Sequence, residues 1–321
     1  MRLRLSVLWV ALVFLVACTG GRQPAPSPTV EGVRWERLAP APTARTEVTA
    51  ASDGTRIFVM GGFAEGGDTV ATVEVYDPES DSWEAGPDLP VAVNHSMSAG
   101  QGDEVYAFGG YLGPGLSIPT DRAFVLRSGE WVELPRMPEP RAAAGAAEVN
   151  GKLYVAGGVG PGGLADSVLV FDPVDAAWST VPGPPTQREH LGVAGVEGRL
   201  YVVGGRTGGI GTNLAATEAY DPATGTWSTL SDMPTPRGGI AAAATNNGFI
   251  AAAGGEADAT FDEVEAFDVR SGRWVSLPPM PTARHGLGVA AIETTIYVIA
   301  GGPEPGLAFS TANEAIDLRG T

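Results

Sequence analysis

The sequence predicts an all-β protein in which one four-stranded antiparallel unit occurs six times and the six units close into a ring. Two observations carry this prediction. Glycine pairs and single tryptophans recur about every 48 residues along the chain. Glycine and proline are also abundant, at 45 and 26 of the 321 residues, which is typical of a chain with many turns and short strands.

Each repeat carries the same markers in the same order. The glycine pairs are at 61–62, 109–110, 157–158, 204–205, 254–255 and 301–302. The repeated tryptophans are Trp35, Trp83, Trp131, Trp178, Trp227 and Trp274, and the seventh, Trp9, lies in the expected signal peptide. Five arginines precede a glycine pair by 16 or 17 residues, namely Arg45, Arg141, Arg188, Arg237 and Arg284. An aromatic residue followed by aspartate lies between the pair and the tryptophan in four repeats.

The fourth repeat shows how these markers divide into strands. Residues 190–196 form the first expected strand, and Glu197-Gly198 forms a tight turn of the kind that needs positive φ. Residues 200–203 form the second strand, which Gly204-Gly205 ends because only glycine tolerates such a backbone. Residues 215–220 form the third strand. Asp221-Pro222 then opens a turn to the fourth strand at 227–230.

The glycine pair, the aromatic residue and the tryptophan about 20–23 residues beyond the pair resemble the kelch motif. The resemblance covers residues 33–321 and implies a six-bladed β-propeller with four antiparallel strands in each blade. The last repeat ends without a tryptophan, and Trp35 has no glycine pair before it. The N-terminal strand around Trp35 should therefore complete the last blade. Blade two departs from the pattern, because Val93 replaces its arginine and residues 124–127 replace its aromatic-aspartate turn.

The first 32 residues predict an export signal and a tether outside the propeller. Arg2 and Arg4 precede an apolar run of 12 residues, which is too short for an ordinary membrane span. The run leads into residues 15–18, Leu-Val-Ala-Cys, which resemble a bacterial lipobox and imply lipidation of Cys18. We expect a signal peptide at 1–17, a lipidated, flexible proline-rich tether at 18–32 and the propeller at 33–321. This predicts an exported lipoprotein, periplasmic or at the outer surface of the cell envelope. A plain secretory signal is the alternative.

The composition excludes several classes of function. A net charge of -17 argues against nucleic-acid binding, which needs a basic surface. It also argues against attraction to anionic lipid headgroups, so we expect the protein to contact the membrane through its lipid alone. The single cysteine excludes a disulfide framework and a cysteine-rich zinc module. Galactose oxidase, a copper radical oxidase with kelch repeats, needs a tyrosine crosslinked to a cysteine. The only cysteine of this chain is the expected lipidation site, so that chemistry is excluded. No nucleophile elbow or phosphate loop occurs, so we expect no cofactor.

The loops predict which face of the ring binds a ligand. The turns between first and second strands and between third and fourth strands are short throughout. The second-to-third loops at 63–69, 111–121, 159–164 and 206–214 are longer and variable, and they share a face with the links between blades. Because function usually lies on variable loops held by a rigid scaffold, we expect the site near the axis on this face. Tyr111 begins one of these loops.

The arginines and histidines are the candidate site residues, and each set has two interpretations. The recurring arginines, Arg45, Arg141, Arg188, Arg237 and Arg284, either form an anion site for a carboxylate or hydrogen-bond neighbouring backbone carbonyls. A feature repeated in each blade is more often structural. His95, His190 and His285 lie in alternate blades just after the arginine position, which suggests a metal triad. His285 is offset by one residue, so we expect no metal. The repeated tryptophans and tyrosines are expected to pack between blades.

Two functions follow from this arrangement. The first is a monomeric, membrane-tethered module that binds a protein or glycan. If the arginines form an anion site, this ligand carries a carboxylate. The alternative is an enzyme resembling the N-acetylneuraminate epimerases, which are exported kelch propellers that open a sugar-acid ring. There the arginines would clamp the carboxylate, and His190 with Glu189 would act as general acid and base, without a metal. No catalytic signature selects this alternative, so the binding module is preferred.

Overall fold

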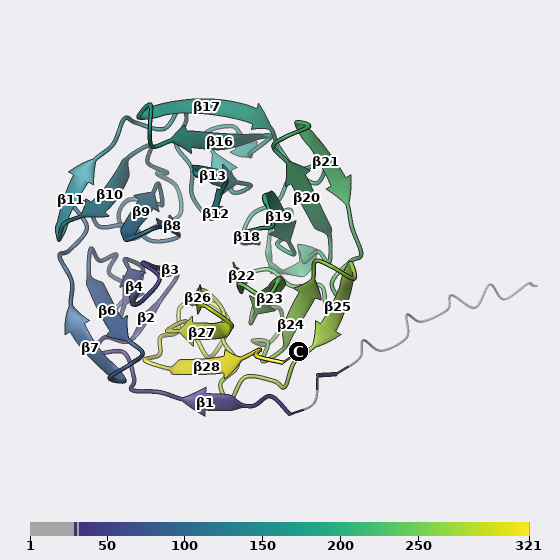
Figure 1. Ribbon diagram of the computed structural model, residues 1–321. Coiled ribbons are helices and arrows are strands. Elements are labelled where there is room, and N and C mark those ends of the chain that lie inside the picture. The colour runs from purple at the N-terminus through teal and green to yellow at the C-terminus, as the bar shows by residue number, and fades with distance from the viewer. Residues whose placement is uncertain (1–28, 31, 321) are drawn as a thin grey trace, which may run out of the picture.

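Six four-stranded antiparallel sheets stand around a central axis in the computed structural model, which describes residues 29–30 and 32–320 (Figure 1). In this part of the chain the only helical element is a single 3₁₀ turn, η1 (Ile210–Thr212). The predicted all-β, six-bladed propeller is therefore confirmed. No helix in the described residues is long and apolar enough to span a membrane.

The blades follow one another along the chain, each running from the axis outward. Blade one holds β3 (Thr49–Ser52), β4 (Ile57–Met60), β6 (Val73–Asp77) and β7 (Ser82–Ala85), and blade two holds β8 (Met97–Gln101), β9 (Glu104–Phe108), β10 (Ala123–Arg127) and β11 (Glu130–Glu133). Blade three holds β12 (Gly145–Val149), β13 (Lys152–Ala156), β16 (Ser167–Asp172) and β17 (Ala177–Pro182), and blade four holds β18 (Gly192–Val196), β19 (Arg199–Val203), β20 (Thr217–Asp221) and β21 (Thr226–Thr229). Blade five holds β22 (Ala241–Ala244), β23 (Phe249–Ala253), β24 (Val264–Asp268) and β25 (Arg273–Ser276), and blade six holds β26 (Gly288–Ile292), β27 (Thr295–Ile299), β28 (Asn313–Asp317) and β1 (Trp35–Arg37). The loops add two short pairs, β2 (Arg45–Thr46) with β5 (Phe63–Ala64) and β14 (Val159–Gly160) with β15 (Gly163–Leu164).

The position of a strand in its blade explains its composition. Second strands are buried apart from the first residue of some of them, and β4 is buried throughout, because neighbouring blades cover both of their faces. The innermost strands line a narrow channel and need small residues, as the four alanines of β22 illustrate. A Cβ on Gly192 of β18 would lie 2.6 Å from the Cβ of Ala242 in the next blade. The core is therefore a series of layers between blades, with a channel left along the axis.

The N-terminal strand closes the ring, as the unpaired Trp35 predicts. β1 pairs antiparallel with β28, placing Trp35 opposite Ile316 (Figure 1). The Trp35 indole N–H donates to the carbonyl of Pro278, 2.7 Å away in the preceding link. The other five repeated tryptophans make the same bond to Ala39, Pro87, Pro135, Pro182 and Ser231. The junction between the two ends of the chain is thus equivalent to the five others.

The glycine pairs join each blade to the next. The second residue of a pair donates its N–H to the carbonyl at the arginine position of the following blade, as Gly205 does to Arg237 at 2.8 Å. The prediction for blade six is wrong by one residue. Gly301 donates to Arg45, so the pair there is Ala300-Gly301, and Ala300 adopts a positive φ of 56°. Alanine tolerates this left-handed conformation at a modest cost, which is why the Gly-Gly signal points one position too late.

The predicted signal peptide, Cys18 and most of the tether lie outside the described residues. Two described residues of the stretch expected to be tether contact the propeller, and the first of them, Thr29, pairs with Ser276 of β25. The Val30 N–H also donates to the Ser276 carbonyl at 3.0 Å. The chain therefore approaches the ring beside blade five before β1 completes blade six.

Candidate functional site at the propeller axis

Six equivalent residues surround the axis where the links between blades lead into the innermost strands. Each lies two positions after the arginine position and has a left-handed backbone: Glu47, His95, Ala143, His190, Gly239 and Gly286. Their backbones form a ring of hydrogen bonds from blade to blade, such as His95 N–H to Glu47 carbonyl at 3.1 Å. The ring closes with the N–H of Val48 donating to the Gly286 carbonyl at 3.3 Å. This ring fixes the direction of each side chain relative to the axis.

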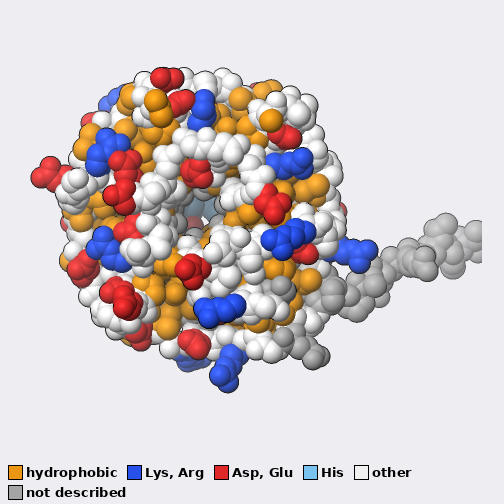
Figure 2. All heavy atoms as spheres, viewed as in Figure 1, with side chains coloured by type: hydrophobic (Ala, Val, Ile, Leu, Met, Phe, Trp, Pro, Cys, Tyr) orange, Lys and Arg blue, Asp and Glu red, His pale blue; other side chains and the backbone are white. Residues whose placement is uncertain are grey.

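Only three members of this ring carry a polar side chain. Ala143, Gly239 and Gly286 contribute little or nothing, which leaves space for Glu47, His95 and His190. These three line a cavity of about 100 Å³ on the axis. Figure 2 shows the axial hollow of the ring in the space-filling view. The sequence therefore makes a symmetric scaffold asymmetric at its centre.

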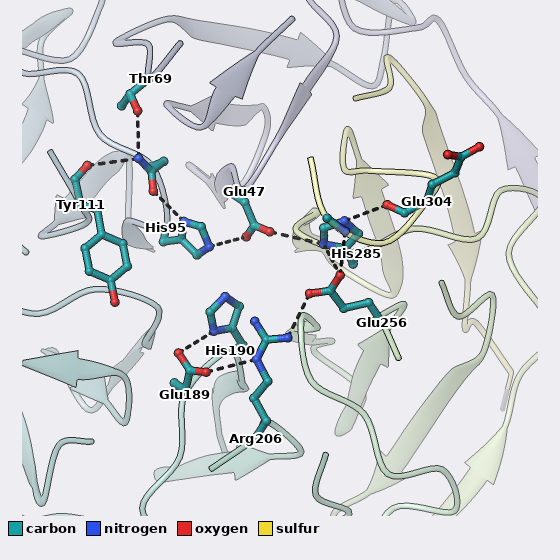
Figure 3. Close-up of polar contacts among 12 residues, drawn as sticks. Glu47, Thr69, His95, Tyr111, Glu189, His190, Arg206, Glu256, His285 and Glu304 are labelled. Carbon is teal, nitrogen blue, oxygen red and sulfur yellow. Dashed lines mark hydrogen bonds and ion pairs between the residues drawn. The ribbon is translucent and has the colours of Figure 1, made fainter. Parts of the chain in front are cut away.

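His95 is held on both sides of its ring. Its Nδ1 lies 2.7 Å from Asn94 Oδ1, and its Nε2 lies 3.1 Å from Glu47 Oε2 (Figure 3). Asn94 donates from Nδ2 to Thr69 Oγ1 at 2.9 Å and to the Gly113 carbonyl at 3.2 Å, so its Oδ1 must face the histidine. His95 therefore carries a proton on Nδ1. Burial, together with His190, lowers the pKa of His95 to about 4 against the opposing effect of Glu47.

His190 is oriented in the same way by a different partner. Its Nδ1 lies 2.9 Å from Glu189 Oε2, and Arg206 Nε donates to the other oxygen of Glu189 at 3.1 Å. Figure 3 shows the second ring nitrogen turned toward Glu47 and His95. The two imidazole centroids are 4.9 Å apart. Ligand atoms of Glu47, His95 and His190 all lie within 4.8 Å of one another.

A chain of charged groups connects the two sides of the site. Glu47 Oε1 lies 3.3 Å from His285 Nδ1, and Glu256 Oε2 lies 3.6 Å from the same nitrogen. Glu256 also accepts from Arg206 Nη1 at 3.0 Å. Burial raises the pKa of Glu47, but His95 and His285 outweigh it and hold that pKa well below its ordinary value. Burial lowers the pKa of His285, but Glu47 and Glu256 outweigh it and leave that pKa raised.

The five repeated arginines lie inside the blades and away from the axial cavity. Each is fully buried: Arg45, Arg141, Arg188, Arg237 and Arg284. Arg45 is representative, since Nη1 donates to the Gly61 carbonyl at 2.9 Å and Nη2 to Glu74 Oε2 at 2.8 Å. None of the five lines the cavity. Each of the five donates to at least one backbone carbonyl of its own blade.

The other predicted site residues do meet at the axis. Tyr111 is buried with its ring edge-on to His95, at 5.7 Å between centroids, and burial raises its pKa to about 12. His95, His190 and His285 all belong to one network. His285 lies one residue before Gly286, the axial-ring residue of blade six, and its side chain still reaches Glu47.

Sequence reasoning missed Glu47, Arg206 and Glu256. A signal for them exists in the repeat itself. Glu47 occupies the same position relative to the arginine as His95 and His190. Arg206 and Glu256 directly follow a glycine pair, as Tyr111 does. Superimposing the six repeats would have aligned Glu47 with His95 and His190, and Arg206 and Glu256 with Tyr111.

The fold and the repeated markers define a β-propeller of the kelch class, a class that generally serves in protein interaction. The family model described as the KLHDC2/KLHL20/DRC7 Kelch-repeats domain matches residues 95–302, and a Kelch motif model matches residues 44–90. The chain belongs to the Kelch-repeat family. No curated protein matches it.

Proposed function

We propose that this chain is an envelope-tethered binding module that holds a protein partner on its long-loop face. This face comprises the second-to-third loops at 63–69, 111–121, 159–164, 206–214, 256–263 and 302–310. The supporting observation is where large apolar side chains meet solvent. Of six such residues in the described chain, four lie on these loops: Leu116, Ile118, Ile210 and Leu307. They lie on the loops of blades two, four and six, and exposed large apolar side chains on one face favour a docking surface.

The charge of the long-loop face indicates the chemistry of the partner. Exposed acidic side chains lie on the loops of the same face: Glu65, Asp68, Asp258, Asp262 and Glu304. The only basic residue in these loops is Arg206, which is buried between Glu189 and Glu256. Complementary charge favours encounter with the matching partner and disfavours like-charged ones. We therefore expect a protein segment that carries basic and apolar side chains together.

The loops of this face support one another, so the surface is organised before a partner arrives. Thr69 Oγ1 donates to the Gly113 carbonyl at 2.5 Å, joining the loops of blades one and two. Thr260 Oγ1 donates to the Pro303 carbonyl at 2.8 Å, joining those of blades five and six. A preorganised surface loses less conformational entropy on binding, which favours affinity.

Of the ligands expected from the sequence, a protein is preferred over a carboxylate-bearing ligand or a glycan. A carboxylate ligand and the sugar-acid epimerase alternative both relied on the repeated arginines as an anion site, and those arginines lie inside the blades. The acidic loops give no support to an anionic ligand. A glycan ligand likewise has no specific contact in its favour, so a protein partner is preferred.

Lipidation of Cys18 completes the proposal, and its support is the lipobox-like sequence alone. Attachment through Cys18 would keep the long-loop face close to the cell envelope. Expression in a bacterial host should give a membrane-bound, acylated protein, and Cys18→Ser should release it into the soluble fraction. Intact-mass measurement of the wild type without added acyl mass would reject the tether while leaving partner binding open.

Selection from a random peptide display library tests the binding proposal. Peptides enriched on the wild type should combine lysine or arginine with apolar residues, and their binding should weaken with salt because exposed charges are screened. The double variant Ile118→Ser/Leu307→Ser should lose them. Val174→Ser is the matched control, because Val174 is 92% exposed and lies on a third-to-fourth turn. Enrichment of acidic peptides, or equal loss in the control, would refute the proposal.

A further inference from the structure

We propose that Glu47, His95 and His190 form a binding site for a divalent transition-metal ion, Zn²⁺ in the first instance, on the propeller axis. This inference goes beyond partner binding and does not depend on it. The three side chains come from blades one, two and four, and each is directed by the left-handed backbone of the axial ring. They supply one carboxylate and two imidazoles, a donor set that suits zinc.

The spacing of the donor atoms fits a single ion. Ligand atoms of all three residues lie within 4.8 Å of one another. Glu47 Oε2 and His95 Nε2 are 3.1 Å apart. Two donors at about 2.0 Å from a tetrahedral zinc ion are separated by about 3.3 Å, so this pair needs little adjustment. The free nitrogen of His190 faces the same space (Figure 3).

The hydrogen bonds of both imidazoles direct a lone pair toward this space. Asn94 accepts from Nδ1 of His95, and Glu189 accepts from Nδ1 of His190. In the neutral tautomer that results, each Nε2 is unprotonated and free to ligate a metal. The Nε2 lone pair of His95 then faces the Glu47 carboxylate, an arrangement that is repulsive unless a cation lies between them. A protonated His95 paired with Glu47 is the competing explanation, and the experiment separates the two.

The surroundings resemble the supporting shell of a metal site. A ligating histidine commonly donates its other N–H to a carboxylate or carbonyl, as both histidines do here. Arg206 and Thr69 in turn hold Glu189 and Asn94. The cavity of about 100 Å³ beside the three donors leaves room for water or a partner's side chain as a further ligand. We therefore expect three protein ligands and an open position.

Metal binding is measured on the untagged full chain carrying Cys18→Ser, so that no thiol competes. The probe is Zn²⁺ in competition with a chromophoric chelator, followed by X-ray absorption of the zinc-bound protein. We expect one equivalent of Zn²⁺ with two imidazoles among its ligands. The chain has only three histidines, so a pair of imidazoles must include His95 or His190. His285→Asn should keep both imidazoles, because His285 faces the far side of Glu47.

Variants assign the ligands. His95→Asn and His190→Asn should each weaken Zn²⁺ binding more than about 100-fold, since loss of an outer partner alone costs about 10–100-fold. Asparagine is chosen because it tolerates the left-handed backbone at these positions. Glu189→Gln should fall within the smaller range, and Ser98→Ala, which lines the same cavity, should bind as the parent does. Circular dichroism confirms folding, and Glu47→Gln replaces any histidine variant that fails to fold.

Three results would overturn the proposal. One is Zn²⁺ affinity no tighter than that of the His190→Asn variant. Another is a zinc shell without imidazole nitrogen. The third is a proton on Nε2 of His95, seen by ¹⁵N NMR, that persists when Zn²⁺ is added, because this would establish the imidazolium–carboxylate pair in its place.

Discussion

At the scale of residues, a buried ion pair and an apolar pair occupy the same place in different blades. Four buried arginines pair with a glutamate on the third strand of their own blade: Arg45 with Glu74, Arg188 with Glu218, Arg237 with Glu265 and Arg284 with Glu314. In blade two Val93 and Phe124 stand at these two positions. In blade three Leu169 stands at the glutamate position, and Glu139 supplies the carboxylate to Arg141. Blade two therefore replaces both charged partners with apolar residues, and blade three takes its carboxylate from another position.

Removing one member of such a pair should cost more than replacing both. Arg237→Ala leaves Glu265 charged and buried, so we expect the free energy of unfolding to fall by about 3–5 kcal/mol. The double variant Arg237→Val/Glu265→Phe copies blade two and should lose less. Urea unfolding monitored by tryptophan fluorescence measures both. A double variant less stable than Arg237→Ala would contradict this interpretation of the pairs.

The turn aspartates give a pH dependence whose sign follows from their hydrogen bonds. Ser80 and the Glu79 N–H bond the Asp77 carboxylate and lower its pKa. A lowered folded-state pKa contributes stability above the unfolded value of about 3.9, which is lost as pH falls through the folded value. Asp77→Asn should therefore lower the melting temperature at pH 7, and its difference from wild type should shrink as the pH falls below that unfolded value. Asp103→Asn, in an exposed turn, is the control; a difference independent of pH would contradict the expectation.

The arginine position was predictable from sequence, whereas its partners were not. Arg237 repeats at a fixed distance from a glycine pair, so its structural role follows from periodicity. Glu265 lies 28 residues further along the chain, and only strand pairing brings the two together. Glu47 was missed for a different reason. It occupies the same position in its repeat as His95 and His190 but is a different type of residue.

At the scale of elements, the second residue of each glycine pair lies against the link that enters its own blade. Gly255 has a φ of 118°, and a Cβ there would lie 2.8 Å from the Gly238 carbonyl. Its N–H donates to Arg284 in the next blade. The same residue therefore needs an unusual backbone and a close approach. Ala300 shows that the first position of a pair tolerates a methyl group, whereas the second position is glycine in all six blades.

Substitution at the second position should be far more costly than at a turn. Gly255→Ala meets both steric conflicts, so we expect it to lower the free energy of unfolding by at least about 2 kcal/mol more than Gly272→Ala. Gly272 is the matched control, since its φ is 66° and a methyl group added there would have no neighbouring atom within 4 Å. Equal losses in thermal or urea unfolding would show that the close approach of Gly255 to the link of its own blade is not what selects glycine.

At the scale of the whole molecule, the ring depends on a strand from the opposite end of the chain. The count of markers predicts this closure, because one tryptophan stands before the first complete repeat and one is missing after the last. Periodicity cannot predict the axial site, since residues from blades one, two and four meet only once the ring has closed. The fold was therefore largely predictable from sequence, and the site only in part.

Removal of the closing strand should open the molecule. Deletion of residues 29–37 exposes the edge of β28, and an unpaired edge strand is a template for aggregation. We expect a lower melting temperature and concentration-dependent association by light scattering. Deletion of residues 19–26, which precede the described contacts, should leave both properties unchanged. A stable monomer lacking β1 would show that closure is dispensable.

The molecule acts, in our central proposal, through its long-loop face. The most direct measurement places a photo-crosslinking amino acid at Ile118 or at Val174 in the protein expressed in its own cells, followed by mass spectrometry. From Ile118 we predict a protein adduct whose attachment maps to a segment rich in basic and apolar residues, and Glu304→Lys should reduce it. From Val174, on the opposite face, we predict none. Equal crosslinking from both positions, or an adduct from Val174 alone, would contradict the proposal.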